Sequence, residues 1–127
     1  MPFQLANPDL LPDTDTARDA DMYEVPLQAG DVVIMATDGL FDNLWEEQLL
    51  ELVEEALEDG RQDADVAEEL ALMLATVSHD NALDRNFRSP WAVEAAAAGV
   101  LPAMERMMPK GGKLDDCTVV VGIVQAV

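Results

Sequence analysis

Two acidic turns contain the residues of this sequence that are best suited to chemistry. Asp38 follows the apolar run 32–36, whereas Asp115 precedes a second apolar run, 117–124. If the runs are adjacent antiparallel strands, the end of one meets the start of the other, and both carboxylates lie at one edge of the sheet. Each turn alone is also ordinary turn chemistry. Because two carboxylates repel unless a cation lies between them, the pair predicts a site for a hard divalent ion such as Mg²⁺ or Mn²⁺.

The two apolar runs predict the strands that hold these turns. Residues 32–36 read Val-Val-Ile-Met-Ala and residues 119–124 read Val-Val-Val-Gly-Ile-Val. Apolar residues on consecutive positions, many of them β-branched, are typical of strands covered on both faces. A short extended piece is expected at 23–26, before the turn at Gly30. Gly39 permits a sharp turn after the first strand.

Two helices are expected after the first strand. The first runs from about Leu44 to Glu58, with Asn43 as its cap and its glutamates facing outward. The second begins after Asp63, which can cap it. Its apolar residues recur at the spacing of one buried helical stripe: Val66, Leu70, Met73, Leu74 and Val77.

A third helix is expected beyond an irregular segment. Residues 79–88 are polar and show no period, so they predict a loop in which His79 is exposed. Ser89 followed by Pro90 is a cap with proline at the first helical position, which predicts a helix over 91–98. The large apolar side chains nearby, like the earlier tryptophan, are expected to pack in the core: Trp45, Trp91, Met104, Met107 and Met108.

Composition excludes several classes of partner. The chain has 7 Lys and Arg against 26 Asp and Glu, a net charge of -19, so nucleic acid and anionic membrane surfaces would repel it. The single cysteine, Cys117, excludes an internal disulfide and suits a reducing compartment. No apolar run is long enough to cross a membrane, and the amino terminus lacks the features of a signal peptide. An intracellular protein without membrane insertion is expected.

The number of elements indicates an incomplete fold. The 127 residues have room for one domain, of which residues 1–22, polar and interrupted by prolines, are expected to be loop. Two or three strands and three helices form an α/β layered (α+β) arrangement. They are too few to cover both faces of the strands or to pair every edge. We therefore expect association with another copy or a partner, or further strands upstream.

Three motifs follow one another at compatible spacing. They are Thr37-Asp38-Gly39-Leu40-Phe41-Asp42-Asn43 after Gly30-Asp31, then Ser89-Pro90-Trp91-Ala92, then the run from Gly111 through Asp115-Asp116-Cys117-Thr118 to Val121. Together they resemble the C-terminal half of a protein phosphatase 2C (PPM-type) domain. The stretch Pro2-Phe3-Gln4-Leu5 resembles the one that precedes the first motif in the branch of the family with mitochondrial and plant organellar phosphatases. The resemblance covers nearly all of residues 1–127 and implies part of a β-sandwich flanked by antiparallel helices, in a mitochondrion or chloroplast.

The resemblance also implies an activity. Such a domain is a protein serine/threonine phosphatase, in which a pair of Mn²⁺ or Mg²⁺ ions activates a water that attacks phosphoserine or phosphothreonine of a protein substrate. Asp38 and Asp115 match two catalytic metal ligands. Of the other matched positions, Gly39 and Asp42 would fix the first turn. Asp116 would orient a ligand or water, and Thr118 would make a local hydrogen bond at the start of its strand.

Other motifs of that family do not occur in the sequence. There is no Arg-Gly phosphate-binding segment and no Asp-Gly-x-Gly-Gly turn with a bridging aspartate. Because two ligands do not hold a metal pair, the chain is expected to be a phosphatase fragment with little activity alone. The alternative is a noncatalytic regulatory or interaction remnant of such a domain.

Overall fold

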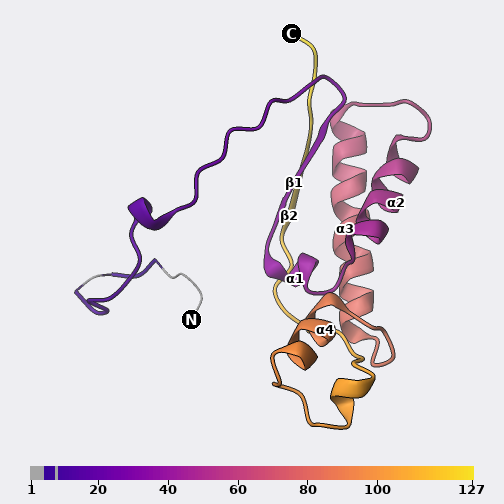
Figure 1. The fold of residues 1–127 in the computed structure, drawn as a ribbon. Coiled ribbons are helices and arrows are strands. Elements are labelled where there is room, and N and C mark those ends of the chain that lie inside the picture. Colours follow the sequence, from indigo (N-terminus) through magenta and orange to yellow (C-terminus); the bar gives the residue numbers. More distant parts are fainter. Residues whose placement is uncertain (1–4, 8) are drawn as a thin grey trace.

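A pair of antiparallel strands and a layer of helices form the body of the molecule (Figure 1). The structure is a computed structural model and describes residues 5–7 and 9–127. Strand β1, Val32–Ala36, pairs with strand β2, Val119–Ile123, in a register that places Ile34 opposite Val121. The antiparallel adjacency that was assumed for the two runs is therefore found, although β2 is shorter than the run 117–124.

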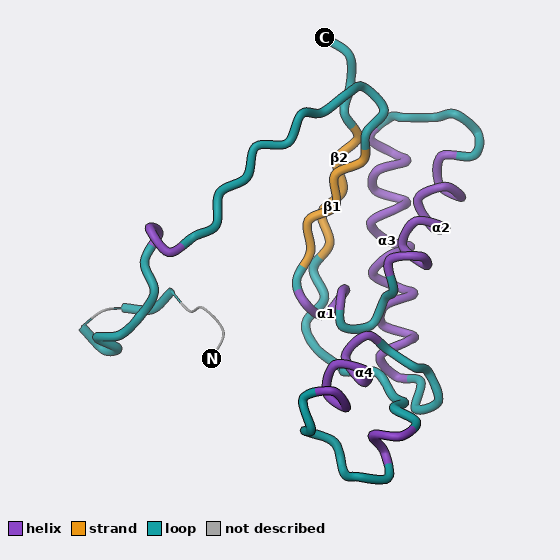
Figure 2. Tube along the Cα trace, in the orientation of Figure 1, coloured by secondary structure: helices purple, strands orange, loops and turns teal. Residues whose placement is uncertain are grey.

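The helices follow β1 and precede β2 along the chain. Figure 2 shows α2 and α3 side by side, with α3 lying along the strand pair. The α-helices are α1 (Asp38–Phe41), α2 (Glu46–Leu57), α3 (Ala64–Leu83) and α4 (Pro90–Ala97), and two short 3₁₀ turns are η1 (Ala17–Asp19) and η2 (Glu105–Met107).

Helix α3 carries the predicted cap and stripe, but it is longer than the sequence indicates. The Asp63 carboxylate accepts a hydrogen bond from the Val66 amide at 3.0 Å, as expected for an N-cap. The helix then continues to Leu83, so the prediction of an irregular segment from residue 79 is wrong for its first five residues. Polar residues remain helical there because Ser78 and Asn81 donate to backbone carbonyls around α1. His79 is exposed, but it lies in a helix.

The core lies between α3 and one face of the strand pair. Leu40, Leu44, Leu70 and Leu74 form its buried centre. Along β1, half-buried residues alternate with exposed ones. Val33 is 42% exposed, Met35 67% and Val120 54%. The described residues therefore cover one face of the strand pair, and the predicted cover on the other face is not found among them.

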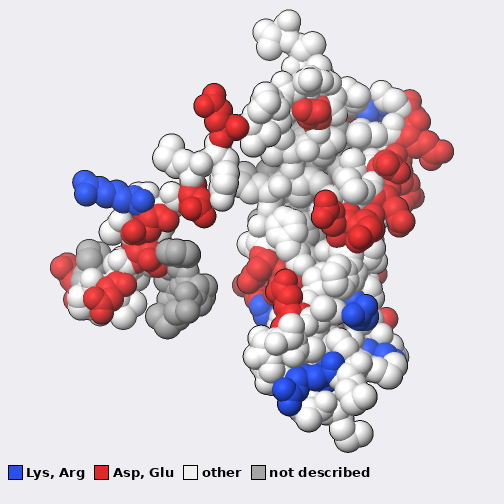
Figure 3. Space-filling view, in the orientation of Figure 1, with Lys and Arg blue, Asp and Glu red and all other residues white. Residues whose placement is uncertain are grey.

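The caps predicted for α2 and α4 have different outcomes. Helix α2 begins at Glu46 after Trp45, so the prediction that Asn43 caps it is wrong. Its outward glutamates make a continuous acidic surface, as expected (Figure 3). Helix α4 begins as predicted, with the Ser89 hydroxyl accepting from the Ala92 amide at 3.0 Å. It ends before Gly99, whose φ of +73° favours glycine.

The methionines near η2 do not fill the core. Met104, Met107 and Met108 are 88%, 85% and 70% exposed, so the expectation of core packing is wrong for them. They lie between α4 and Pro109, in a segment whose only regular structure is one short 3₁₀ turn. Trp45 and Trp91 are half-buried.

Most of the described residues ahead of β1 extend away from the body (Figure 1). Their described part contains η1 and a bridge between Leu5 and Asp15. Residues 23–26 form no strand. The Pro2–Gln4 part of the Pro-Phe-Gln-Leu stretch lies outside the described residues. Within those residues, no helix is both long enough and apolar enough to span a bilayer.

Candidate metal centre

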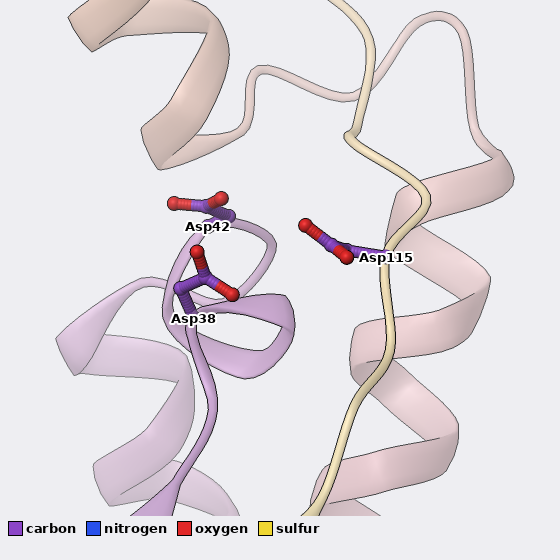
Figure 4. Close-up of side chains that lie close together, drawn as sticks. All are labelled: Asp38, Asp42 and Asp115. Carbon is purple, nitrogen blue, oxygen red and sulfur yellow. The ribbon is translucent and has the colours of Figure 1, made fainter. Parts of the chain in front are cut away.

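Three carboxylates converge at one end of the strand pair. Asp38 is the first residue of α1, Asp42 lies at the end of that helix, and Asp115 lies on the segment before β2 (Figure 4). Each side chain offers an oxygen within 4.8 Å of the others. The structure thus brings Asp38 and Asp115 together at the predicted edge. Asp42, which the sequence predicted only to fix the turn, also contributes its carboxylate, while its amide donates to the Asp38 carbonyl at 2.7 Å.

Thr37 extends the pairing of the strands into the two turns. Its amide donates to the Thr118 carbonyl at 3.0 Å. Its hydroxyl donates to the Asp116 carbonyl at 2.8 Å and accepts from the Thr118 amide at 3.0 Å. Thr118 and Asp116 therefore support the site through their backbone. No local sequence signal marks this role of Thr37, because its partners lie about eighty residues later in the chain.

Gly39 allows the two turns to touch. The residue is buried and helical. A Cβ at this position would lie 2.5 Å from the Asp116 carbonyl oxygen and 2.9 Å from its carbon. The sequence predicted Gly39 as a residue of a sharp turn, but the structure shows close approach of two backbone segments as its role. This approach sets the separation of the acidic turns.

Asn43 joins the two turns from the interior. It is 1% exposed. Its side-chain amide donates to the Gly39 carbonyl at 3.0 Å and to the Lys113 carbonyl at 2.7 Å, and its side-chain oxygen accepts from the Lys113 amide at 2.8 Å. With these bonds, Asn43 acts as a clamp between α1 and the segment before β2, in place of the predicted role as a helix cap.

Lys113 places a positive charge among the carboxylates. Its ammonium nitrogen is 2.9 Å from an oxygen of Asp42, 2.9 Å from one of Asp115 and 3.9 Å from one of Asp38. Hydrogen bonds to Asp42 and Asp115 raise the pKa of Lys113. The same ammonium group, followed by the Asp116 amide, lowers the pKa of Asp115. Both effects favour the charged forms of Lys113 and Asp115.

The donor set fits a hard divalent cation. All three side chains supply carboxylate oxygens, which are the ligands that Mg²⁺ and Mn²⁺ prefer. The Lys113 ammonium group acts as an internal cation at the same place, which shows that the local field favours positive charge. Asp38, Asp42 and Asp115 are the residues that would hold an ion here. The Asp116 side chain is exposed and is not part of the carboxylate group.

Comparisons with known proteins identify the family. The sequence model of "Protein phosphatase 2C" matches residues 16–82. The chain is 38% identical to "Probable protein phosphatase 2C 26" of Arabidopsis thaliana over 127 residues, covering 97% of this chain and 39% of that protein. It is 34% identical to "Protein phosphatase PTC7 homolog" of Xenopus laevis over 129 residues, with the same two coverages of 97% and 39%.

A solved structure shares the arrangement of elements. The X-ray structure of the photosystem II phosphatase PBCP aligns with a TM-score of 0.74 and 29% sequence identity, covering 91% of this chain and 44% of that one. The chain belongs to the protein phosphatase 2C family, and its mixed α/β fold matches part of a phosphatase of that family. It spans about two fifths of the length of the Arabidopsis and Xenopus relatives.

Proposed function

We propose that residues 1–127 form the carboxyl-terminal portion of one metal-dependent protein serine/threonine phosphatase domain. The observation that carries this proposal is the convergence of Asp38 and Asp115, which lie 77 positions apart in the sequence yet offer oxygens within 4.8 Å of each other. Membership of the protein phosphatase 2C family supplies the reaction class. The substrate would be a phosphoserine or phosphothreonine residue of a protein.

The residues of this chain would contribute one side of the active site. Asp38 and Asp115, with Asp42 beside them, would bind Mn²⁺ or Mg²⁺. When bound, a pair of such ions supplies Lewis-acid stabilisation of a phosphoryl group and a nucleophilic water at neutral pH. Lys113 offsets part of the negative charge of the carboxylates. Three carboxylates are too few for two ions, so the remaining ligands would come from the rest of the domain.

The remainder of such a domain would also cover the exposed sheet face. Val33, Met35 and Val120 present apolar side chains there, and a second layer would bury them. We infer a mitochondrial or chloroplast setting as well. Its support is the similarity of the chain to a photosystem II phosphatase and the stretch Pro2–Leu5, which resembles the organellar branch of the family.

A chimera tests the proposed function. Residues 1–127 would replace the matching portion of the Arabidopsis relative, and release of phosphate from a phosphothreonine peptide would be followed with and without Mn²⁺. We expect Mn²⁺-dependent hydrolysis by the chimera and little or none by the 127-residue chain alone, because that chain lacks part of the ligand set. A folded chimera that hydrolyses nothing would favour the noncatalytic remnant. Rapid hydrolysis by the isolated chain would show that its ligand set is sufficient.

Lys113 should weaken metal binding by the isolated chain. A divalent ion and the ammonium group compete for the same carboxylate oxygens, so Lys113→Met is expected to lower the Kd for Mn²⁺. Loss of one nearby charge interaction in a solvated site corresponds to about fivefold. Isothermal titration with Mn²⁺ measures this. Lys110→Met removes the same charge three residues away and should change the Kd much less. Equal effects of the two substitutions would show that only net charge matters.

A further inference from the structure

Positive charge is concentrated at one end of this acidic molecule. Residues 85–113 contain five of the seven basic residues and only two acidic ones, whereas the rest of the chain has 24 acidic residues against two basic ones. Figure 3 shows the blue side chains gathering over the end of the body that carries α4, and red side chains covering α2. The five basic residues are Arg85, Arg88, Arg106, Lys110 and Lys113.

Two of these basic residues line a small pocket together with three apolar residues. The pocket has a volume of about 200 Å³ and is lined by Arg88, Met107, Met108, Pro109 and Lys110. We call it the cationic pocket. It is too small for a cofactor and suits one or two side chains. Among the described residues, neither Arg88 nor Lys110 forms an ion pair, so both charges are available to a ligand.

The cationic pocket is attached to the carboxylate cluster by short, hydrogen-bonded segments. The Gly111 amide donates to the Phe87 carbonyl at 2.7 Å, and the Ser89 hydroxyl donates to the Gly111 carbonyl at 2.6 Å. These bonds hold the start of α4 against the chain just before Lys113. Because Lys110 and Lys113 are three residues apart, their Cα atoms are separated by at most about 11 Å. An extended peptide covers that distance in about three to four residues.

We propose that the cationic pocket binds an acidic side chain of the phosphoprotein substrate, about three or four positions from the phosphorylated residue. This proposal rests on the proposed phosphatase function. The Arg88 guanidinium group can bind a carboxylate with two parallel hydrogen bonds. Met107 and Met108 are flexible enough to pack against neighbouring substrate side chains of different shapes. The acidic remainder of the surface repels an acidic peptide, so the pocket would also fix the orientation of the substrate.

Binding of unphosphorylated peptides to the 127-residue chain tests the pocket separately from catalysis. Fluorescence anisotropy would compare two eleven-residue alanine-based peptides that carry a central threonine. One has two consecutive glutamates, and the other has two lysines at the same positions. The glutamates would lie three and four positions after the threonine in one peptide, and before it in another. We expect one glutamate arrangement to bind. The double variant Arg88→Ala with Lys110→Ala should weaken that binding at least about tenfold. Arg18→Ala removes an exposed charge from the segment ahead of β1 and should leave the peptide binding unchanged.

The active chimera provides a second readout. With a phosphothreonine peptide of the preferred arrangement, the double variant should raise KM about tenfold and leave kcat unchanged, and an all-alanine phosphopeptide should show no such difference. Hydrolysis that is insensitive to the double variant for every peptide would overturn the pocket while the proposed function stands. Binding of the acidic peptide by a folded chimera that shows no Mn²⁺-dependent hydrolysis would overturn the function and leave the pocket in place.

Discussion

Gly39→Ala is expected to destabilise the chain by about 3 kcal/mol, although alanine is the better helix former. The added Cβ would lie 2.5 Å from the Asp116 carbonyl oxygen and 3.2 Å from the Cys117 Cα. Both are backbone atoms, which cannot rotate away as the end of a side chain can. The turns would have to separate, which would strain the bonds that join them, from Asn43 to Lys113 and from Thr37 to Asp116.

Urea denaturation measures this effect, with Gly122→Ala as the matched control. Gly122 lies in β2, and a Cβ there would meet no atom within 4 Å. The control should be neutral or slightly stabilising, because alanine loses less conformational entropy than glycine on folding. Similar free energies of unfolding for the two variants would contradict the close approach of the acidic turns. A loss of Mn²⁺ affinity in Gly39→Ala alone would further support the role of that approach in setting the site.

The parts of the fold that were predictable from sequence rest on local patterns. The β-branched run 32–36 identifies a strand without knowledge of its partner, and Val66, Leu70 and Leu74 identify the buried side of α3 through their spacing. The meeting of Asp38 and Asp115 required one further step. It followed from the assumption that two adjacent strands run antiparallel, which the register of β1 and β2 bears out.

The supporting residues were not predictable because their partners are distant in sequence. Asn43 is read locally as a helix cap, yet its buried amide bonds to Lys113, seventy residues later. Ser78 and Asn81 make the end of α3 look like a loop, since the backbone carbonyls that they satisfy lie almost forty residues earlier. Such polar residues resemble loop residues until the tertiary acceptors are known.

Neutralising both predicted ligands should abolish divalent-metal binding. Asp38→Asn with Asp115→Asn keeps the shape of each side chain and removes two of the three converging negative charges. Residues that merely support a ligand change metal affinity by about 10–100-fold, so loss of two ligands should exceed that range. The fold should persist, because both side chains are exposed. The Mn²⁺-induced rise in Tm, small in the unaltered chain because its ligand set is incomplete, should vanish.

The control for net charge is Asp9→Asn with Asp21→Asn. These two exposed residues precede β1 and lie outside the carboxylate group. The control removes the same number of negative charges from the chain, so it reports how much Mn²⁺ is attracted by the general field of an acidic protein. We expect it to retain at least half of the Mn²⁺ binding of the unaltered chain at 0.15 M salt, where distant charges are screened.

Electron paramagnetic resonance of Mn²⁺ tests the central claim most directly, because the signal of the free hexaaqua ion decreases as the ion is bound. Titration of the unaltered 127-residue chain should show loss of the free signal, and the Asp38→Asn with Asp115→Asn variant should leave the signal equal to that of buffer. The Asp9→Asn with Asp21→Asn control should behave like the unaltered chain. Equal Mn²⁺ uptake by all three chains would contradict a metal centre built on Asp38 and Asp115.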